Sequence, residues 1–331
     1  MKKIIIFLSV IITTLFIISG CNSNENSLNS EAKILQLANV TTASDDIGVT
    51  LEDFAKSVEE ETNGEIQVEV YNDGVLGSES KTTDHVRQGQ IQMQLTHSIS
   101  ILEQYDPIFG IDELPYLFKS REDARAAYDG EVGNIINEKA ENNGFKVLAY
   151  WEHGVRHITN NVKPIKNLED LDGIKLRVTS DTRREVFEKL GASPVTMGFT
   201  ELYSALQQGV MDGQENSINN IYTSNIYEVQ DYLSLSSHMY SSSPLIINLD
   251  VWNSLSEDER KVLEENAVKY RDIQRERHVE QEEENIKRIV DEGVELNEVD
   301  IEEFEQISER IMDELSERFG EELINAVEKY R

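Results

Sequence analysis

Apolar positions along the chain follow two periods, and their order predicts strands that alternate with helices. Residues 65–71 (EIQVEVY) alternate strictly between polar and apolar side chains, which is typical of a strand with one buried face. Other short apolar runs between turn residues predict further strands. Strands are expected at residues 33–38, 65–71, 91–96, 146–151, 173–178, 232–236 and 245–249, with a short one at 294–296.

Helical periodicity separates these strands. Leu51, Phe54, Ala55 and Val58 recur at three- and four-residue spacing, and Asn63-Gly64 ends that helix. Further helices are expected at residues 80–88, 131–142, 182–190, 200–208 and 256–290, one helix opens at Ser120, and one or two more finish the chain. The long one begins with Ser256 and Glu259 in the spacing of a capping box.

Strands alternating with helices indicate an α/β protein with largely parallel sheets. The length of 331 residues suits about two such lobes. Ligands of this architecture lie beyond the carboxyl ends of strands, in crevices between units. The sequence therefore predicts a ligand site between two lobes.

The N-terminus has the pattern of a bacterial lipoprotein signal peptide. A basic start precedes an uncharged, mostly apolar run from Ile4 to Ile18, shorter than a typical membrane-spanning helix. An uncleaved anchor helix is the alternative interpretation. Ile18-Ser19-Gly20-Cys21 resembles the lipobox, in which the cysteine is lipidated and becomes the first mature residue. We expect residues 1–20 to be removed, Cys21 to carry the lipid anchor, and residues 21–30 to form a flexible stalk.

The charge of the chain excludes several classes of partner. Asp and Glu number 63 against 31 Lys and Arg, which gives a formal net charge of −32. Nucleic acids and anionic lipid surfaces require a basic footprint, so neither is an expected partner. An anionic ligand would need a local cationic pocket. The single cysteine leaves no intrachain disulfide, Cys-rich zinc site or iron–sulfur cluster.

Motifs of common enzyme and metal chemistry are missing from the sequence. It contains no GxSxG, no P-loop, no GxGxxG after a strand and no HExxH. His153 and His157 have the spacing of a helical metal pair, but Gly154 and the extended pattern of residues 155–158 argue against it. The acidic run at 280–284 is interpreted as a solvated helix face. No cofactor or metal is expected.

Two arginines stand at positions where strands could present them to a ligand. Arg177 lies near the carboxyl end of the apolar strand KLRV, and Arg156 follows Gly154-Val155. A guanidinium is a rigid fork that pairs bidentately with a carboxylate. The alternative for each arginine is a structural salt bridge to one of the many acids of the chain.

Longer motifs carry a family resemblance. Residues 197–216 read MGFTELYSALQQGVMDGQEN, residues 168–178 read LEDLDGIKLRV, residues 113–118 read ELPYLF, and residues 75–79 read VLGSE. Together they resemble the substrate-binding proteins of TRAP (tripartite ATP-independent periplasmic) transporters, the DctP family. The resemblance covers the chain from Lys33 to the C-terminus.

The resemblance implies a fold of two α/β lobes joined by hinge strands and a long bridging helix. It places lobe I at residues 31–152 and 242–280, and lobe II at residues 153–241 and 281–331. It also implies a monomeric protein outside the cytoplasm that is not an enzyme. Such a protein captures an organic acid as the lobes close and delivers it to membrane permease subunits, here while held at the membrane by its lipid.

The resemblance also implies site residues. The family's carboxylate-binding arginine falls on Arg177, and His97 occupies a position that often carries a polar ligand group. For His97, a satisfied polar residue in the cleft wall is the alternative. The full set of implied ligand residues is Arg177, Arg156, Asn216, His97, Phe199, Glu79 and Asn39. Ser217 stands where the family commonly has proline, and His97 replaces the glutamate of sialic-acid binders, which argues against that ligand.

Two arginines, a histidine and an asparagine suit a hydroxylated monocarboxylate. We therefore expect a hexuronate such as glucuronate or galacturonate, with a C4-dicarboxylate as the alternative. Two other functions stay open at this point. One is a surface-anchored enzyme that acts on an acidic sugar through His97 and a carboxylate. The other is a sensory or scaffold protein that feeds a membrane receptor.

Overall fold

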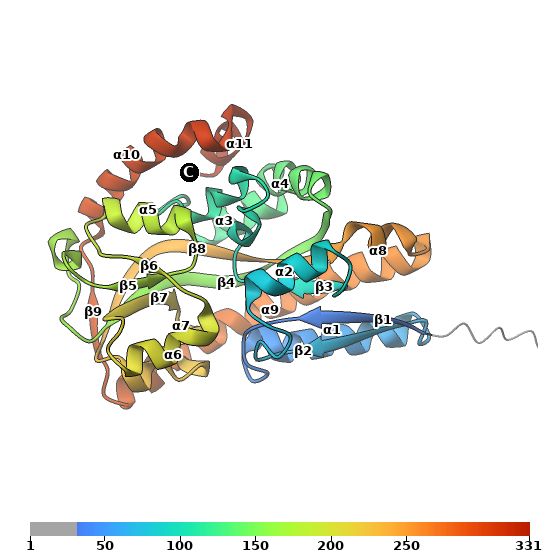
Figure 1. Ribbon diagram of the computed structural model, residues 1–331, viewed down its shortest axis with the longest axis horizontal. Coiled ribbons are helices and arrows are strands. Elements are labelled where there is room, and N and C mark those ends of the chain that lie inside the picture. Colours follow the sequence, from blue (N-terminus) through green and yellow to red (C-terminus); the bar gives the residue numbers. More distant parts are fainter. Residues whose placement is uncertain (1–31) are drawn as a thin grey trace, which may run out of the picture. The chain divides into compact units, whose positions relative to one another are not determined.

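The strands and helices follow the expected alternation (Figure 1). The computed structural model describes residues 32–331, so the expected signal peptide, Cys21 and the stalk lie outside the described residues. The strands are β1 (Lys33–Ala38), β2 (Ile66–Tyr71), β3 (Met93–Leu95), β4 (Phe145–Asn160), β5 (Leu176–Val178), β6 (Val195–Thr196), β7 (Gly213–Ser217), β8 (Tyr232–Asn248) and β9 (Glu295–Glu298). Among residues 32–331, no helix combines the length and the apolar character needed to span a bilayer.

The helices of the described residues lie close to the predicted positions, except α7 and α8, which were not predicted. They are α1 (Asp46–Glu61), α2 (Glu79–Arg87), α3 (Arg121–Asp129), α4 (Glu131–Asn142), α5 (Asp181–Lys189), α6 (Phe199–Gln207), α7 (Ile218–Thr223), α8 (Leu249–Ser254), α9 (Glu257–Asp291), α10 (Ile301–Phe319) and α11 (Glu321–Val327). Two 3-10 helices, η1 (Ile99–Leu102) and η2 (Pro107–Glu113), precede α3. Side-chain caps start several helices, as when Asp45 accepts a hydrogen bond from the Ile47 amide at α1.

All nine strands within residues 32–331 belong to one mixed sheet. Their order is β2-β1-β3-β8-β4-β7-β5-β6, with β9 paired to β8. Pairing is parallel within β2-β1-β3 and within β7-β5-β6, but antiparallel where β4 meets β7 and β8 and where β3 meets β8. The prediction of largely parallel sheets therefore holds for the two ends of the sheet and not for its middle. We call β2-β1-β3 with α1 and α2 the first lobe, and β7-β5-β6 with α5, α6 and α7 the second lobe.

The two long strands β4 and β8 connect the lobes. The sequence predicts only pieces of them, because polar residues interrupt their hydrophobic pattern. In β8 the residues Ser241, Ser242 and Ser243 are buried despite being polar. In β4 the chain continues through Gly154, which has a φ of +105° beside a shift of the strand register. These two strands form the hinge that joins the lobes.

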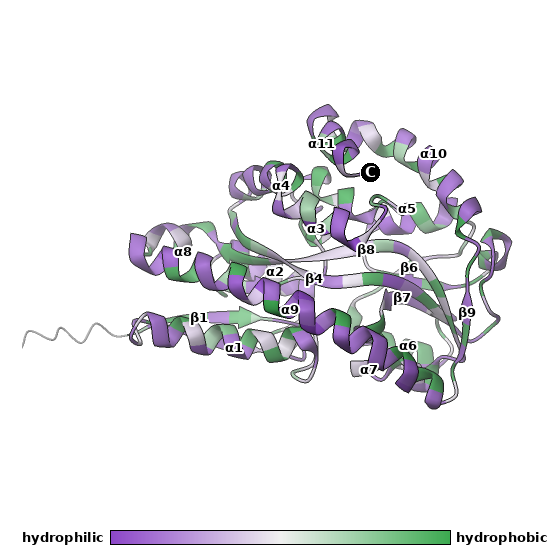
Figure 2. Ribbon diagram, turned by 180° about the vertical axis from the view of Figure 1, so that it is seen from behind, coloured by the Kyte–Doolittle hydropathy of each residue, from purple (hydrophilic) through white to green (hydrophobic). Residues whose placement is uncertain are grey.

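Helix α9 crosses from one lobe to the other. The predicted capping box of Ser256 and Glu259 is present at its start. The helix packs on α1 of the first lobe, then on β4, then on α7 of the second lobe, and Figure 2, the view from behind, shows it crossing in front of the sheet. Its buried stripe is apolar at Leu263 and Ala267 but becomes polar at Gln274, His278 and Asn285, where it passes between the lobes.

The C-terminal helices cover one side of the sheet. α10 packs against η2, and α11 packs against α4. Phe304, Ile311, Phe319 and Leu323 join a hydrophobic cluster that reaches into both lobes. The division of the chain into lobe I at 31–152 and 242–280 and lobe II at 153–241 and 281–331 stays a prediction.

Candidate functional site

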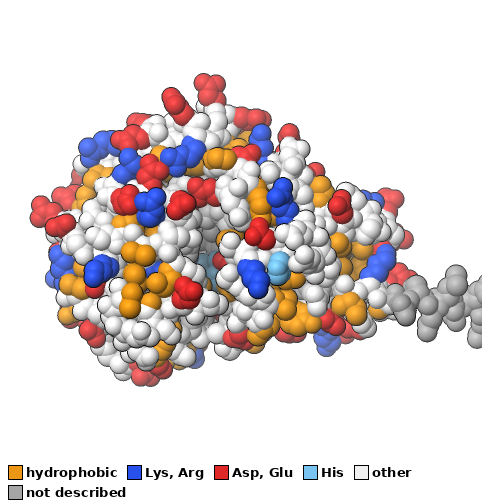
Figure 3. All heavy atoms as spheres, in the orientation of Figure 1, with side chains coloured by type: hydrophobic (Ala, Val, Ile, Leu, Met, Phe, Trp, Pro, Cys, Tyr) orange, Lys and Arg blue, Asp and Glu red, His pale blue; other side chains and the backbone are white. Residues whose placement is uncertain are grey.

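A cavity of about 380 Å³ lies between the lobes. The first lobe and its loops contribute Glu79 and His97, and the second contributes Arg177, Arg183 and Phe199. Figure 3 shows the surface hollowed at this place, with histidine atoms at its base. Six of the seven residues expected from the sequence line this cavity: Arg177, Arg156, Asn216, His97, Phe199 and Glu79.

Arg177 is the middle residue of the short strand β5. Its side chain is buried, and its Nε donates to the carbonyl oxygen of Met197 at 2.8 Å. The guanidinium carbon lies 5.9 Å from the centre of the Phe199 ring. Within residues 32–331 no carboxylate lies within ion-pair distance of it. Burial, opposed by Glu215, lowers the pKa of Arg177 to about 10, so the group remains a cation at neutral pH.

Arg156 has an acid partner inside the protein. Its Nε pairs with Glu215, and its Nη2 lies 3.0 Å from Glu215 Oε1 and 2.7 Å from the Glu215 carbonyl oxygen. Both side chains are buried, and they come from neighbouring strands β4 and β7. The present contacts of Arg156 are thus those of a structural ion pair, although the residue also lines the cavity.

Arg183 is a cavity residue that the sequence did not lead us to expect. Its Nε pairs with Glu113 of η2, and its Nη1 donates to Glu215 Oε1 at 2.7 Å. Its Nη2 is buried and has no hydrogen-bond partner among the described residues. One signal could have found it: Arg183 and Arg184 stand in the first turn of α5, where the helix dipole disfavours cations.

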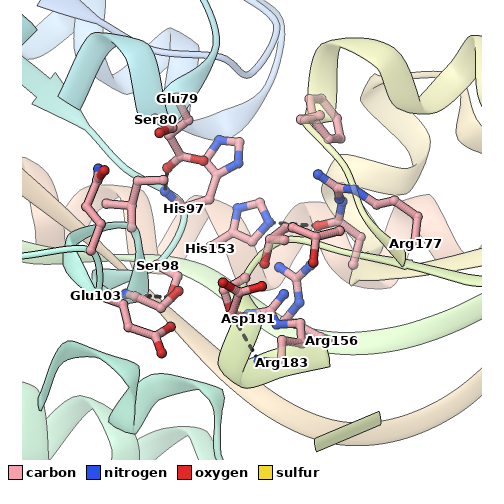
Figure 4. A pocket seen from close by; sticks show the side chains of 18 residues that line it. Glu79, Ser80, His97, Ser98, Glu103, His153, Arg156, Arg177, Asp181 and Arg183 are labelled. Atoms are coloured by element: carbon pink, nitrogen blue, oxygen red, sulfur yellow. Dashed lines mark hydrogen bonds between the residues drawn. The ribbon is translucent and has the colours of Figure 1, made fainter. Parts of the chain in front are cut away.

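Two histidines form the opposite wall. The rings of His97 and His153 stack with centroids 4.5 Å apart (Figure 4). The rings of His97 and Phe199 are nearly perpendicular, with centroids 6.1 Å apart. Burial, with Arg156 and Arg177 nearby, lowers the pKa of His97 to about 3, so this ring is neutral at physiological pH. Its buried Nε2 has no hydrogen-bond partner in the described part of the chain. His97 can therefore take one more hydrogen bond from a ligand.

Asn216 is tied to His153, which the sequence suggested only as a candidate metal ligand. His153 Nε2 lies 2.8 Å from Asn216 Oδ1, and Asn216 Nδ2 donates to Asn220 Oδ1 at 2.9 Å. Burial holds the pKa of His153 well below its usual value. No group of three His, Cys, Asp or Glu side chains within residues 32–331 is arranged to hold a metal ion.

Glu79 and Asn39 differ in their positions. Glu79, the first residue of α2, accepts a hydrogen bond from the His97 amide at 2.6 Å and lines the cavity. Burial raises the pKa of its carboxyl to about 7. Asn39 lies outside the cavity lining. Its side chain instead bonds Thr41 Oγ1 at 2.6 Å and Asn72 Oδ1 at 2.9 Å, and so fixes the loops after β1 and β2.

The chain matches a known protein family over most of its length. The family model of the bacterial extracellular solute-binding proteins, family 7 (DctP), matches residues 37–318. The 2,3-diketo-L-gulonate-binding periplasmic protein of Escherichia coli is 31% identical over 266 residues, which are 80% of this chain and 81% of that protein.

Two solved structures share the fold over nearly the whole chain. The sugar acid binding protein of Advenella mimigardefordensis, in complex with galactonate, superposes with a TM-score of 0.86 at 31% identity, covering 91% of this chain and 99% of that one. A TRAP periplasmic solute binding protein of Sulfitobacter, with bound β-D-galacturonate, gives a TM-score of 0.85 at 29% identity, covering 90% and 99%. The chain therefore belongs to the DctP family of bacterial extracellular solute-binding proteins.

Proposed function

We propose that this protein captures a hydroxylated monocarboxylate, a hexuronate or a closely related sugar acid, and delivers it to the permease of a TRAP transporter. One observation carries the proposal. Arg177 is a buried cation that faces the cavity, and within residues 32–331 it has no acid partner. An uncompensated buried charge is costly, and a ligand carboxylate would supply two charge-assisted hydrogen bonds to it.

The opposite wall supports a ligand with hydroxyl groups. Glu79, with a pKa of about 7, can donate or accept a hydrogen bond, and the neutral ring of His97 has a free Nε2 among the described residues. Hydroxyl groups both donate and accept, so they suit such a wall. In its ionised form Glu79 would repel a second carboxylate. The names of the relatives, which include galactonate, galacturonate and diketogulonate binders, support the same class of ligand.

A C4-dicarboxylate is the second candidate, and Arg183 is the observation that favours it. Arg183 lines the same cavity as Arg177, and its Nη2 has no partner in the described part of the chain, so it offers a second cationic group. The carboxyl groups of Glu113 and Glu215 already pair with this guanidinium, however. The positive charge of Arg183 is therefore partly compensated already, and Arg183 would attract a second carboxylate less strongly than Arg177 attracts the first.

The proposal includes the setting in which the protein works. The lipobox at Cys21 would tether a monomeric binding protein to the outer side of the cell membrane through a flexible stalk. The tether keeps the loaded protein close to its permease, which raises the effective concentration of the two partners. The lobe boundaries given by the family resemblance belong to the same proposal, as does the absence of catalysis.

A ligand panel tests the proposal. Glucuronate, galacturonate, galactonate, succinate and malate are each added to the purified protein, and the melting temperature and the heat of binding are measured. A ligand at 100 times its Kd stabilises the native state by about 2.7 kcal/mol. We expect the hexuronates or galactonate to give the largest shift, with the acid recovered unchanged. A larger shift with succinate favours the dicarboxylate, and conversion of the acid favours the enzyme.

A further inference from the structure

A buried polar cluster lies where the two lobes meet α9, outside the ligand cavity. His278 stands in the middle of α9, and its Nδ1 lies 3.2 Å from Asp46 Oδ2 at the start of α1. Asn219 of α7 donates from Nδ2 to Asp46 Oδ1 at 3.2 Å and to the His278 carbonyl oxygen at 3.0 Å. All three side chains are buried. The cluster therefore joins an element of each lobe to the bridging helix.

The hydrogen bonds place a proton on Nδ1 of His278. The Nδ2 group of Asn219 has two hydrogens, and both are used by Asp46 and by the His278 carbonyl. The contact of 3.1 Å between Asn219 Nδ2 and His278 Nδ1 then needs no hydrogen, because Nδ1 donates its own proton to Asp46. Burial alone would lower the pKa of His278, but Asp46 and Glu282 outweigh it and raise it to about 10. The cluster thus contains a buried ion pair.

Further contacts between α1 and α7 lie beside this ion pair. Thr223 Oγ1 lies 2.9 Å from Asp45 Oδ2, and Asn285 of α9 donates to Asn219 Oδ1 at 3.0 Å. The charged or titratable groups that face His278 are Asp45 and Asp46 of α1, Glu152 and His153 of β4, and Glu282 of α9. Through Thr223 and Asn219, α7 thus contacts both acids at the start of α1.

The hinge strand is shaped to admit His278. A Cβ atom at Gly154 of β4 would lie 2.2 Å from His278 Nε2, so only glycine allows the imidazole this close to the strand. The next residue back, His153, lines the cavity and bonds Asn216, which in turn bonds Asn220 on α7. The residue of β4 that His278 contacts, Gly154, is therefore next in the chain to His153, which lines the cavity and bonds Asn216 of β7.

The lobes touch each other across the cavity in this structure. The centroids of the His97 and Phe199 rings, from opposite lobes, are 6.1 Å apart. A Cβ atom at Gly74, before α2 of the first lobe, would lie 3.2 Å from Cγ2 of Thr200 in α6 of the second lobe. The contacts of Asp46 with Asn219 belong to this same arrangement. We infer that Asp46, Asn219 and His278, together with Asp45 and Thr223, form an interlobe latch that stabilises the closed arrangement and raises ligand affinity without touching the ligand. This inference rests on the proposed capture of a ligand by lobe closure.

Asn219→Ala and Thr223→Val test the latch. The first removes the amide that joins α7 to Asp46 and α9, and the second removes only the hydroxyl beside Asp45. Asn266→Ala is the matched control, because Asn266 is a buried asparagine of α9 that donates to Glu61 of α1 at 3.1 Å within the first lobe.

The only cysteine of the chain is Cys21, so the mature chain with Cys21→Ser accepts spin labels at two introduced cysteines. The exposed residues Val75 and Val210 place one label on each lobe.

Two measurements are made on each variant, the distance between the labels without ligand and the Kd for the tightest-binding acid of the panel. We expect Asn219→Ala to lengthen the mean distance and to weaken binding about ten- to hundredfold, mainly through faster dissociation. Thr223→Val should act in the same direction, by about two- to tenfold. Asn266→Ala should lower the melting temperature while leaving both the distance and the Kd unchanged.

Unchanged distances and Kd values in Asn219→Ala and Thr223→Val overturn the inference. So does an equal loss of affinity in Asn266→Ala, because a general loss of stability would then explain the effect. If no acid of the panel binds the unmutated protein, the proposed function fails. The label distances without ligand still test the latch in that case. Loss of a latch contact should lengthen them whether or not the ligand is known.

Discussion

Arg183 of the second lobe forms a buried ion pair with Glu113, which lies at the end of η2, seventy residues earlier in the chain. The side chains of the two residues are 1% and 0% exposed. Arg183 also pairs with Glu215, which in turn pairs with Arg156. Arg183 thus holds two carboxylates in a buried network of alternating charges, of which Arg156 and Arg183 line the cavity.

Removing the centre of this network should destabilise the protein. Arg183→Ala leaves Glu113 buried without its cation, which costs about 3–5 kcal/mol. The double variant Arg183→Met with Glu113→Gln removes the charge on both sides and should recover part of that loss. Urea denaturation without ligand measures the free energy of unfolding for each. A loss below about 1 kcal/mol in Arg183→Ala would show that the ion pair contributes little to the native state.

Glu79→Gln should change how stability depends on pH. The carboxyl loses its proton near pH 4.5 in the unfolded chain but near pH 7 in the fold, because it is buried. Between these values the folded chain holds a proton on Glu79 that the unfolded chain has lost, so the contribution of Glu79 to stability falls as pH rises and levels off above about pH 7. Glutamine does not titrate. The free energy of unfolding of the variant, relative to that of the wild type, should therefore rise by up to about 3 kcal/mol from the lower to the upper end of this pH range.

Urea denaturation of both chains at about pH 5 and about pH 8, without ligand, measures this difference. The amide oxygen of glutamine can still accept the bond from the His97 amide, so the comparison isolates the charge. The same gap in stability at both pH values would contradict a raised pKa of Glu79.

Cys21→Ser tests the lipid anchor. Without the thiol no lipid can be attached, and the chain should accumulate as the uncleaved precursor. Metabolic labelling with a radioactive fatty acid should mark the wild type and leave the variant unlabelled. Normal labelling of the variant would show that the lipid is carried elsewhere or that the lipobox is misread.

The parts of the fold that local sequence determines were predictable. The capping box of Ser256 and Glu259 is a short-range signal, and it is present at the start of α9. β7 (Gly213–Ser217) was not predicted as a strand, because its sequence GQENS has no apolar side chain although every residue of it is buried. Its partners β4 and β5 satisfy its backbone, and only the tertiary structure reveals them.

The site was predictable where a residue's place in a strand determines its direction. Arg177 lies within the apolar strand β5, and its side chain lines the cavity. Asn39 follows a strand, but the turn after β1 directs it to Asn72 instead. Arg183 depends on a contact with Glu113 over a long sequence separation, and no local pattern encodes that contact.

The most direct test of the proposed function is the Kd of Arg177→Ala and Arg177→Lys for the tightest-binding acid of the panel, measured by calorimetry beside the melting temperature without ligand. Loss of one partner of a buried charged pair costs about 3–5 kcal/mol. Arg177→Ala should therefore weaken binding by about two to four orders of magnitude, at about 1.4 kcal/mol per decade. Arg177→Lys keeps the charge but loses the fork, so its Kd should fall in between. A variant Arg177→Ala that melts at a lower temperature yet binds the acid as tightly as the wild type would contradict the assignment of Arg177 as the carboxylate-binding residue.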